Sequence, residues 1–306
     1  MKRVVSILFV VSIIIILTSC SLDKPSPIQN TTTGLTAESV APENANIPLK
    51  LTQEQQDILN LVPISIEDID DNGNLVLVNL QYPIDVEFDD SRFVKVLDYV
   101  PTSPVGARDM YLHSSTIEAV VEMFTAAREA GIKSDEGGAS SVSSGFRGYD
   151  EQKEIYERDT QSGYVTLPGH SEHHTGLAVD ITIQGVDGAT FGNSPRGTWF
   201  ADNSYLFGLI LRYPEGAESI TGINYESWHF RYVGVIHAYI MKQYNLVFEE
   251  YMQLIQEQGS LYFEKDGVSY FILHQIPQNG TILVPDGFDY NISSDNTGGY
   301  IVTASK

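Results

Sequence analysis

Four segments of the chain carry apolar residues at the spacing of a helix with one buried face. The clearest of them covers residues 114–131. Another is predicted over 52–62, because Thr52 and Gln55 have the spacing of a capping box at the start of a helix. The remaining two helical patterns cover 149–159 and 232–258.

Strand patterns fall between and after these helices. The continuous apolar run over 74–84 predicts a strand that is buried on both faces, and 177–183 is a second strand-like run. From 260 onward, β-branched and aromatic runs are broken by Asp-Gly, Asn-Gly and Gly-Gly pairs, which are typical of hairpin turns. We therefore predict a small β extension over 259–306.

The first twenty residues form a separate pattern. A short basic start precedes an unbroken, mostly apolar run over 4–17, which is typical of a secretory signal. This run is too short to favour a stable membrane-spanning helix, which needs roughly 20 residues. Leu-Thr-Ser-Cys at 17–20 resembles a bacterial lipobox, in which the cysteine is lipidated and becomes the mature N-terminus.

We therefore expect residues 1–19 to be a lipoprotein signal peptide and Cys20 to anchor the chain to the bacterial cell membrane. An uncleaved anchor or a chance cysteine is the alternative, and each interpretation places the protein outside the cytoplasm. Residues 20–50 are rich in Ser, Thr, Asn and Pro, so they cannot bury enough surface to order themselves. They predict a flexible linker with a span of roughly 30 Å.

Composition excludes some partners and some metal ligands. The chain has 18 basic and 40 acidic residues and a net charge of −22, which argues against a nucleic acid as partner. Cys20 is the only cysteine, so an intrachain disulfide is impossible and no thiolate remains for a metal site. Ligands for a metal must therefore come from His, Asp or Glu side chains.

The stretch 168–181 holds three of the chain's seven histidines and also contains Asp180. Apolar residues surround Asp180, and a buried carboxylate needs a cation or strong hydrogen bonds. His229 is similarly placed in an aromatic, strand-like run, and Glu226 precedes it by three residues. Each residue alone would be better explained as a satisfied core histidine or a capping acid. Their combination is hard to explain by packing and favours a metal site.

Two spaced motifs resemble a known family. They are Ser171-x-His173-x-x-Gly176-x-Ala178-x-Asp180 and Glu226-x-x-His229. Together they resemble the signature of VanY-type zinc D,D-carboxypeptidases of the peptidase M15 group, which share a lysostaphin/D-Ala-D-Ala/hedgehog metal-site fold. The likeness covers about residues 74–250.

The resemblance implies a role for each motif residue. It implies that His173, Asp180 and His229 bind one zinc ion, that Glu226 is the general base, and that Arg147 faces the scissile carbonyl. Ser171 and Gln152 are expected, less specifically, to bind the substrate. The remaining histidines, His170 and His174 included, are not expected to be ligands.

The expected fold class is α+β, with a small antiparallel sheet that carries the zinc site and is flanked by helices. The catalytic domain is expected over 51–258, including an N-terminal extension, and the β extension follows it. The implied activity is removal of the terminal D-alanine from peptidoglycan stem peptides. The alternatives are an L,D-carboxypeptidase that acts on tetrapeptide stems, a wall endopeptidase, and a non-catalytic cell-surface binding module.

Overall fold

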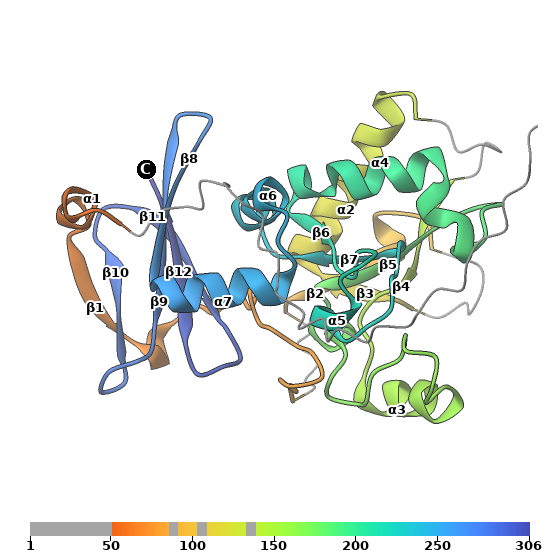
Figure 1. Ribbon diagram of the computed structural model, residues 1–306, viewed down its shortest axis with the longest axis horizontal. Coiled ribbons are helices and arrows are strands. Elements are labelled where there is room, and N and C mark those ends of the chain that lie inside the picture. Colours follow the sequence, from red (N-terminus) through yellow and green to blue (C-terminus); the bar gives the residue numbers. More distant parts are fainter. Residues whose placement is uncertain (1–50, 86–90, 103–108, 133–138) are drawn as a thin grey trace, which may run out of the picture. The chain divides into compact units, whose positions relative to one another are not determined.

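The computed structural model describes residues 51–85, 91–102, 109–132 and 139–306 (Figure 1). The helices are α1 (Gln53–Ile58), α2 (Ser114–Glu129), α3 (Tyr149–Arg158), α4 (Pro195–Asn203), α5 (Glu218–Thr221), α6 (Val235–Tyr244) and α7 (Phe248–Gln258). The strands are β1 (Leu61–Ser65), β2 (Phe93–Lys95), β3 (Tyr111–His113), β4 (Ser140–Ser144), β5 (Ala178–Ile183), β6 (Leu209–Leu211), β7 (His229–Tyr232), β8 (Ser260–Lys265), β9 (Val268–Gln275), β10 (Thr281–Pro285), β11 (Asp289–Ser294) and β12 (Tyr300–Ser305).

The four-stranded sheet with the order β4-β5-β7-β6 carries the predicted chemistry. All three of its strand pairs are antiparallel. In the pairing of β5 with β7, Asp180 lies directly opposite His229. The prediction of an α+β fold with a small antiparallel sheet that carries the site is therefore confirmed.

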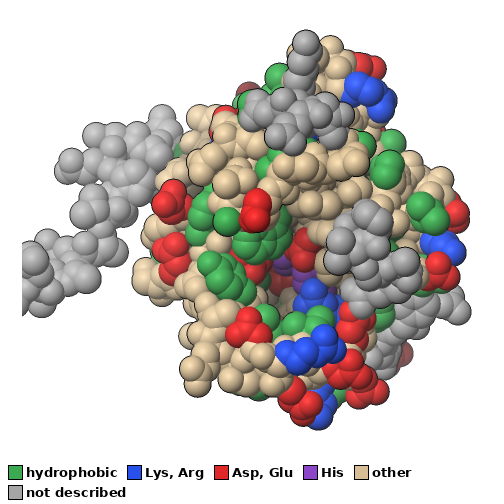
Figure 2. All heavy atoms as spheres, turned by 90° about the vertical axis from the view of Figure 1, so that its right-hand side faces the viewer, with side chains coloured by type: hydrophobic (Ala, Val, Ile, Leu, Met, Phe, Trp, Pro, Cys, Tyr) green, Lys and Arg blue, Asp and Glu red, His purple; other side chains and the backbone are tan. Residues whose placement is uncertain are grey.

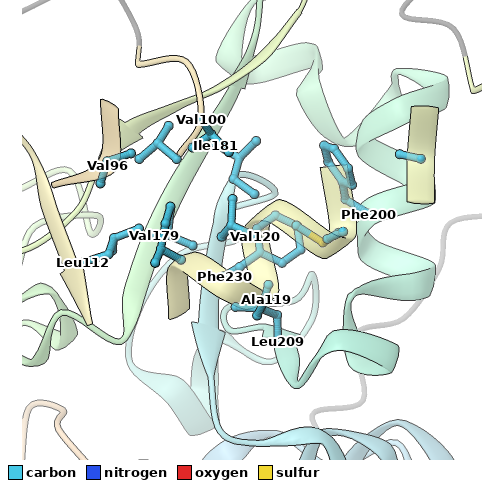
Figure 3. Close-up of a cluster of buried hydrophobic side chains, with 14 of the residues drawn as sticks. Val96, Val100, Leu112, Ala119, Val120, Val179, Ile181, Phe200, Leu209 and Phe230 are labelled. Atoms are coloured by element: carbon cyan, nitrogen blue, oxygen red, sulfur yellow. The ribbon is translucent and has the colours of Figure 1, made fainter. Parts of the chain in front are cut away.

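One face of this sheet packs on α2 (Figure 3). Val179 and Ile181 of β5 and Phe230 of β7 lie in one buried cluster with Val120 of α2. Alternate residues of a strand point to opposite faces, so Asp180, between Val179 and Ile181, points away from this core. Burial of the apolar side chains on one face thereby directs the polar ligands to the other face.

A second four-stranded sheet has the order β11-β12-β9-β8, and a separate two-stranded sheet pairs β1 with β10. Helix α1 has the predicted capping box between Thr52 and Gln55. Leu61 lies opposite Pro285, so the segment just after α1 pairs with the region beyond residue 259. The domain boundaries at 51–258 and 259–306 stay a prediction.

Two predicted elements were wrong. Residues 74–84 do not form a strand, although Leu75 and Leu77 are buried. Side chains replace the missing strand neighbour there, since Arg231 donates hydrogen bonds to the carbonyl oxygens of Asn74 and Val76. The predicted helix over 232–258 is two helices, α6 and α7, which are separated at Asn245, where φ is +52°.

The signal peptide, the linker and Cys20 lie outside the described residues. Within the ranges that the structure describes, every helix is too short or too polar to cross a membrane.

Candidate metal centre

Two of the three predicted ligands meet because adjacent strands bring them together. Asp180 of β5 and His229 of β7 are paired in register, and His229 Nδ1 lies 2.9 Å from Asp180 Oδ1. Both side chains are largely buried. The apolar strand residues on either side fix this contact, because their burial decides which way each strand faces.

The third predicted ligand, His173, lies in a 3-10 turn (Glu172–Thr175) that leads into β5. Its Nε2 lies 3.4 Å from the second oxygen of Asp180, Oδ2. Its Nδ1 lies 2.8 Å from the carbonyl oxygen of Gly145, to which it donates a hydrogen bond in the tautomer that leaves Nε2 unprotonated. The turn ends at Gly176, where φ is +69° and an added Cβ would lie 2.2 Å from the Phe93 ring.

The three side chains fit a metal ion. One ligand atom from each of His173, Asp180 and His229 lies within 4.8 Å of the others. Zinc binds nitrogen and oxygen at about 2.0–2.2 Å, so tetrahedral ligands are separated by about 3.4 Å. The contacts of 2.9 and 3.4 Å that Asp180 makes with the two imidazoles are close to that separation.

The electrostatics of the group favour a cation. Burial lowers the pKa of His173 to about 4, so this imidazole is neutral at pH 7. Burial would raise the pKa of Asp180, but the two imidazoles hold it well below its ordinary value. Burial would also lower the pKa of His229, yet the hydrogen bond to Asp180 and the nearby negative charge of Glu172 outweigh burial and raise it to about 9. The carboxylates therefore attract positive charge to this point.

Glu226 lies beside the group, as the sequence predicted. Its Oε2 is 3.6 Å from His229 Nδ1. Glu226 is buried, and this burial raises the pKa of its carboxyl group to about 7. A carboxyl group with a pKa near neutrality can both accept and return a proton.

Arg147, Gln152 and Ser171 line the same cavity, of about 220 Å³, as the metal-ligand group. Arg147 Nη1 donates a hydrogen bond of 2.7 Å to Gln152 Oε1, and Gln152 Nε2 donates one to a backbone carbonyl. The Ser171 hydroxyl caps the turn that holds His173. Figure 2 shows histidine side chains at the floor of a hollow with charged side chains near it.

The other five histidines lie outside the metal-ligand group, and each makes a polar contact elsewhere. The Nδ1 atoms of His170 and His174 contact the carbonyl oxygens of Asn79 and Arg147. The remaining three are His113, which contacts Ser115; His237, which contacts Tyr251 and Thr303; and His274, which contacts Asp295.

The sequence interpretation missed a buried ionic network beside the site. Glu172 Oε1 accepts hydrogen bonds from Arg212 Nε at 2.9 Å and from Arg231 Nη1 at 3.0 Å. Arg212 also forms two hydrogen bonds with Glu249. The available signal was the pair of arginines within apolar and aromatic runs of the sequence, 209–213 and 229–233.

Two imidazoles and one carboxylate that can hold a zinc ion, with a second carboxylate 3.6 Å from one of the imidazoles, are a ligand set typical of zinc hydrolases. Comparison with known proteins narrows this class. A family model described as VanY, D-alanyl-D-alanine carboxypeptidase, matches residues 109–235. The D-alanyl-D-alanine carboxypeptidase of Enterococcus faecium is 35% identical over 235 residues, which are 76% of this chain and 75% of that relative. The chain belongs to the VanY D-alanyl-D-alanine carboxypeptidase family, and it is a zinc metallopeptidase.

Two solved structures share the fold. The vancomycin-resistance D,D-dipeptidase VanXYg, crystallised with a D-Ala-D-Ala phosphinate analog, has a TM-score of 0.63 and 29% identity. The match covers 81% of this chain and 99% of that one, so the likeness extends beyond residues 109–235. The LdcB LD-carboxypeptidase has a TM-score of 0.51 and 34% identity, over 59% of this chain and 86% of that chain.

Proposed function

We propose that this chain is a zinc-dependent D-alanyl-D-alanine carboxypeptidase that removes the C-terminal D-alanine from peptidoglycan stem peptides. The observation that carries the proposal is the buried group of His173, Asp180 and His229 beside Glu226, in a chain of the VanY family. These four residues line one cavity of about 220 Å³.

His173, Asp180 and His229 would hold one zinc ion. When bound, zinc supplies a Lewis acid and lowers the pKa of a water at its fourth position to about 7. Glu226 accepts the proton of the attacking water and later gives it to the nitrogen of the departing D-alanine. Its raised pKa suits both transfers, because a strongly acidic carboxyl group would bind the proton too weakly.

Arg147 is assigned to the carbonyl oxygen of the bond that is cut. Its guanidinium lines the cavity and is oriented by Gln152 and Ser144. Donors that are already oriented stabilise developing negative charge without a cost of reorganisation. Ser171 and Gln152 line the cavity and would bind the terminal carboxylate and adjacent peptide groups of the substrate.

The proposal is tested by incubating the purified protein with zinc and a stem pentapeptide that ends in D-Ala-D-Ala. Release of one D-alanine per peptide, absent in a Glu226→Ala variant that still binds zinc, is the expected result. A wild-type protein as inert as this variant would contradict the proposal and favour a binding module.

A second candidate is an L,D-carboxypeptidase, and the likeness to LdcB favours it. A tetrapeptide stem, which lacks the second D-alanine, separates the two candidates when it is assayed beside the pentapeptide. Faster release of D-alanine from the tetrapeptide than from the pentapeptide would show that the enzyme is an L,D-carboxypeptidase.

We also propose that Cys20 carries a lipid and holds the enzyme at the outer face of the bacterial cell membrane. The support is the basic start, the apolar run and the lipobox-like end of residues 1–20. The full chain is expected to partition into detergent after expression in a bacterial host, whereas a Cys20→Ser variant should lose the lipid mass. An unmodified Cys20 in the wild-type protein would refute the anchor.

A further inference from the structure

Two buried polar atoms face each other beside the candidate metal centre without a hydrogen-bond partner. They are Glu172 Oε2 and His229 Nε2, which lie 3.7 Å apart. Glu172 is 1% exposed and His229 is 4% exposed. A separation of 3.7 Å is longer than a hydrogen bond, but a small rotation of either side chain would close it. Glu172 Oε2 can accept a hydrogen bond that His229 Nε2 can donate.

Glu172 is held so that this oxygen faces His229. Its other oxygen, Oε1, accepts hydrogen bonds from both Arg212 and Arg231. Arg212 also donates hydrogen bonds to Glu249, and Arg231 donates hydrogen bonds to three backbone carbonyls. The carboxylate therefore cannot turn away without breaking buried charge-assisted hydrogen bonds.

The position of Glu172 determines which nitrogen of His229 is available to a metal ion. An imidazole that binds a metal ion is neutral and keeps one N–H, and in His229 a proton on Nε2 would point at Glu172. The unprotonated Nδ1 would then face Asp180, which lies 2.9 Å away. His173 is held in the opposite way, since its Nδ1 contacts a backbone carbonyl and its Nε2 faces Asp180. The two imidazoles thus present different nitrogens to the same point.

We propose that Glu172 is a positioning residue that accepts the Nε2 proton of His229 and so fixes Nδ1 as the metal-binding nitrogen. This inference rests on the proposed zinc site. Carboxylate partners of metal-bound histidines raise the basicity of the ligand, and their loss typically weakens metal affinity about 10–100-fold. Glu172 has no place in the proton transfers assigned to Glu226.

The test compares Glu172→Gln with Glu249→Gln in the full chain. In Glu172→Gln the amide oxygen should stay with the two arginines, which leaves the NH₂ group facing His229 Nε2. His229 would then have to carry its proton on Nδ1, the nitrogen that faces the site. Glu249→Gln perturbs the same ionic network without touching His229, so it is the matched control.

Zinc affinity is measured by competition with a chromophoric chelator, without substrate. We expect a zinc dissociation constant that is about 10–100-fold weaker for Glu172→Gln and within about threefold of wild type for Glu249→Gln. An unchanged affinity in Glu172→Gln, or equal losses in both variants, would overturn the inference. Failure of the wild-type chain to bind zinc would instead refute the proposed function.

A second measurement does not depend on the folding of any variant. Nitrogen-15 shifts of the zinc-loaded wild-type protein should show His229 with its proton on Nε2 and His173 with its proton on Nδ1. A proton on His229 Nδ1 would overturn the inference.

Discussion

Each of the two four-stranded sheets has a histidine next to an aspartate, but the two pairs differ in what else the aspartate binds. In the sheet with the order β4-β5-β7-β6, Asp180 contacts two imidazoles, and the far nitrogen of His229 has no hydrogen-bond partner. At the sheet with the order β11-β12-β9-β8, His274 lies 2.8 Å from Asp295. The other oxygen of Asp295 accepts two backbone N–H groups.

The difference shows that residue type alone does not make a metal site. Hydrogen bonds from His274 and the backbone outweigh burial and hold the pKa of Asp295 well below its ordinary value. The Asp295 carboxylate is therefore satisfied by the chain itself. Asp180 instead contacts the two imidazoles of His173 and His229, and the Glu226 carboxylate lies 3.6 Å from His229, so a metal ion can take the place of the protons between these groups. Substitutions at the first sheet should change activity, and those at the second should change stability.

The largest expected effect is that of Glu226→Gln. Loss of the proposed base should lower kcat about 10²–10⁴-fold, because the attacking water loses its proton acceptor. Zinc content and thermal stability should stay close to wild type. Alanine release and metal analysis measure these quantities, with the exposed Glu215→Gln as control. If Glu226→Gln lost activity only because it unfolded, the first sheet would differ from the second neither in activity nor in stability, and the comparison would fail.

Arg147→Ala should have the next largest effect. Removal of one donor to the developing oxyanion typically lowers kcat by about 10²–10³-fold. The change should appear in kcat more than in zinc affinity, since the Arg147 guanidinium donates hydrogen bonds to Gln152 and Ser144, neither of which is a proposed ligand. Steady-state kinetics on the pentapeptide measure it. A change in KM alone would mean that Arg147 binds the substrate and does not stabilise the developing oxyanion.

Asp295→Ala tests the second sheet. It leaves the N–H groups of Thr297 and Gly299 without their acceptor, and the Gly299 group is buried, where an unsatisfied donor costs about 1–3 kcal/mol. We expect the free energy of unfolding to fall by about that amount, with zinc affinity unchanged. Urea denaturation measures the fall, and the exposed Asp289→Ala is the control. Weakened zinc binding in Asp295→Ala would show that the two sheets are coupled.

The smallest expected effect is a pH dependence from His237. Burial lowers its pKa to about 3, from 6.5 for an exposed histidine, so the unfolded chain binds a proton that the folded chain excludes. The contribution of neutral His237 to the free energy of unfolding is therefore complete above pH 6.5 and is lost as the pH falls towards 3. Within that window the free energy of unfolding changes by about 1.4 kcal/mol per pH unit. A shallower slope in His237→Gln, measured by urea denaturation between pH 7 and 5, is the expected result, and an equal slope would contradict it.

The sequence indicated candidate site residues because these residues break strong local patterns. Asp180 and His229 are polar positions in apolar, strand-like runs, and the register of β5 with β7 brings them together. The capping box at Thr52 and the helix over 114–131 were also confirmed, since short-range hydrogen bonds and one apolar face determine them.

Elements that depend on distant partners were not predictable in this way. An apolar run such as 74–84 reads as a strand, but its backbone is satisfied in part by Arg231, more than 150 residues later. The role of Glu172 could not be predicted from the sequence, because its partners Arg212 and Arg231 are 40 and 59 residues away. The break at Asn245 depends on one positive φ angle, which helical periodicity does not reveal.

The pairing of β1 with β10 has a consequence for the order in which the chain can assemble. Asn60 and Asp286, at one end of this ribbon, are hydrogen-bonded although they are 226 residues apart in sequence. During synthesis, β1 emerges early, and its partner strand β10 follows much later in the chain. Contacts of such long sequence separation slow folding. A chain cut before β10 would leave β1 without its paired strand and so expose its backbone edge to proteases.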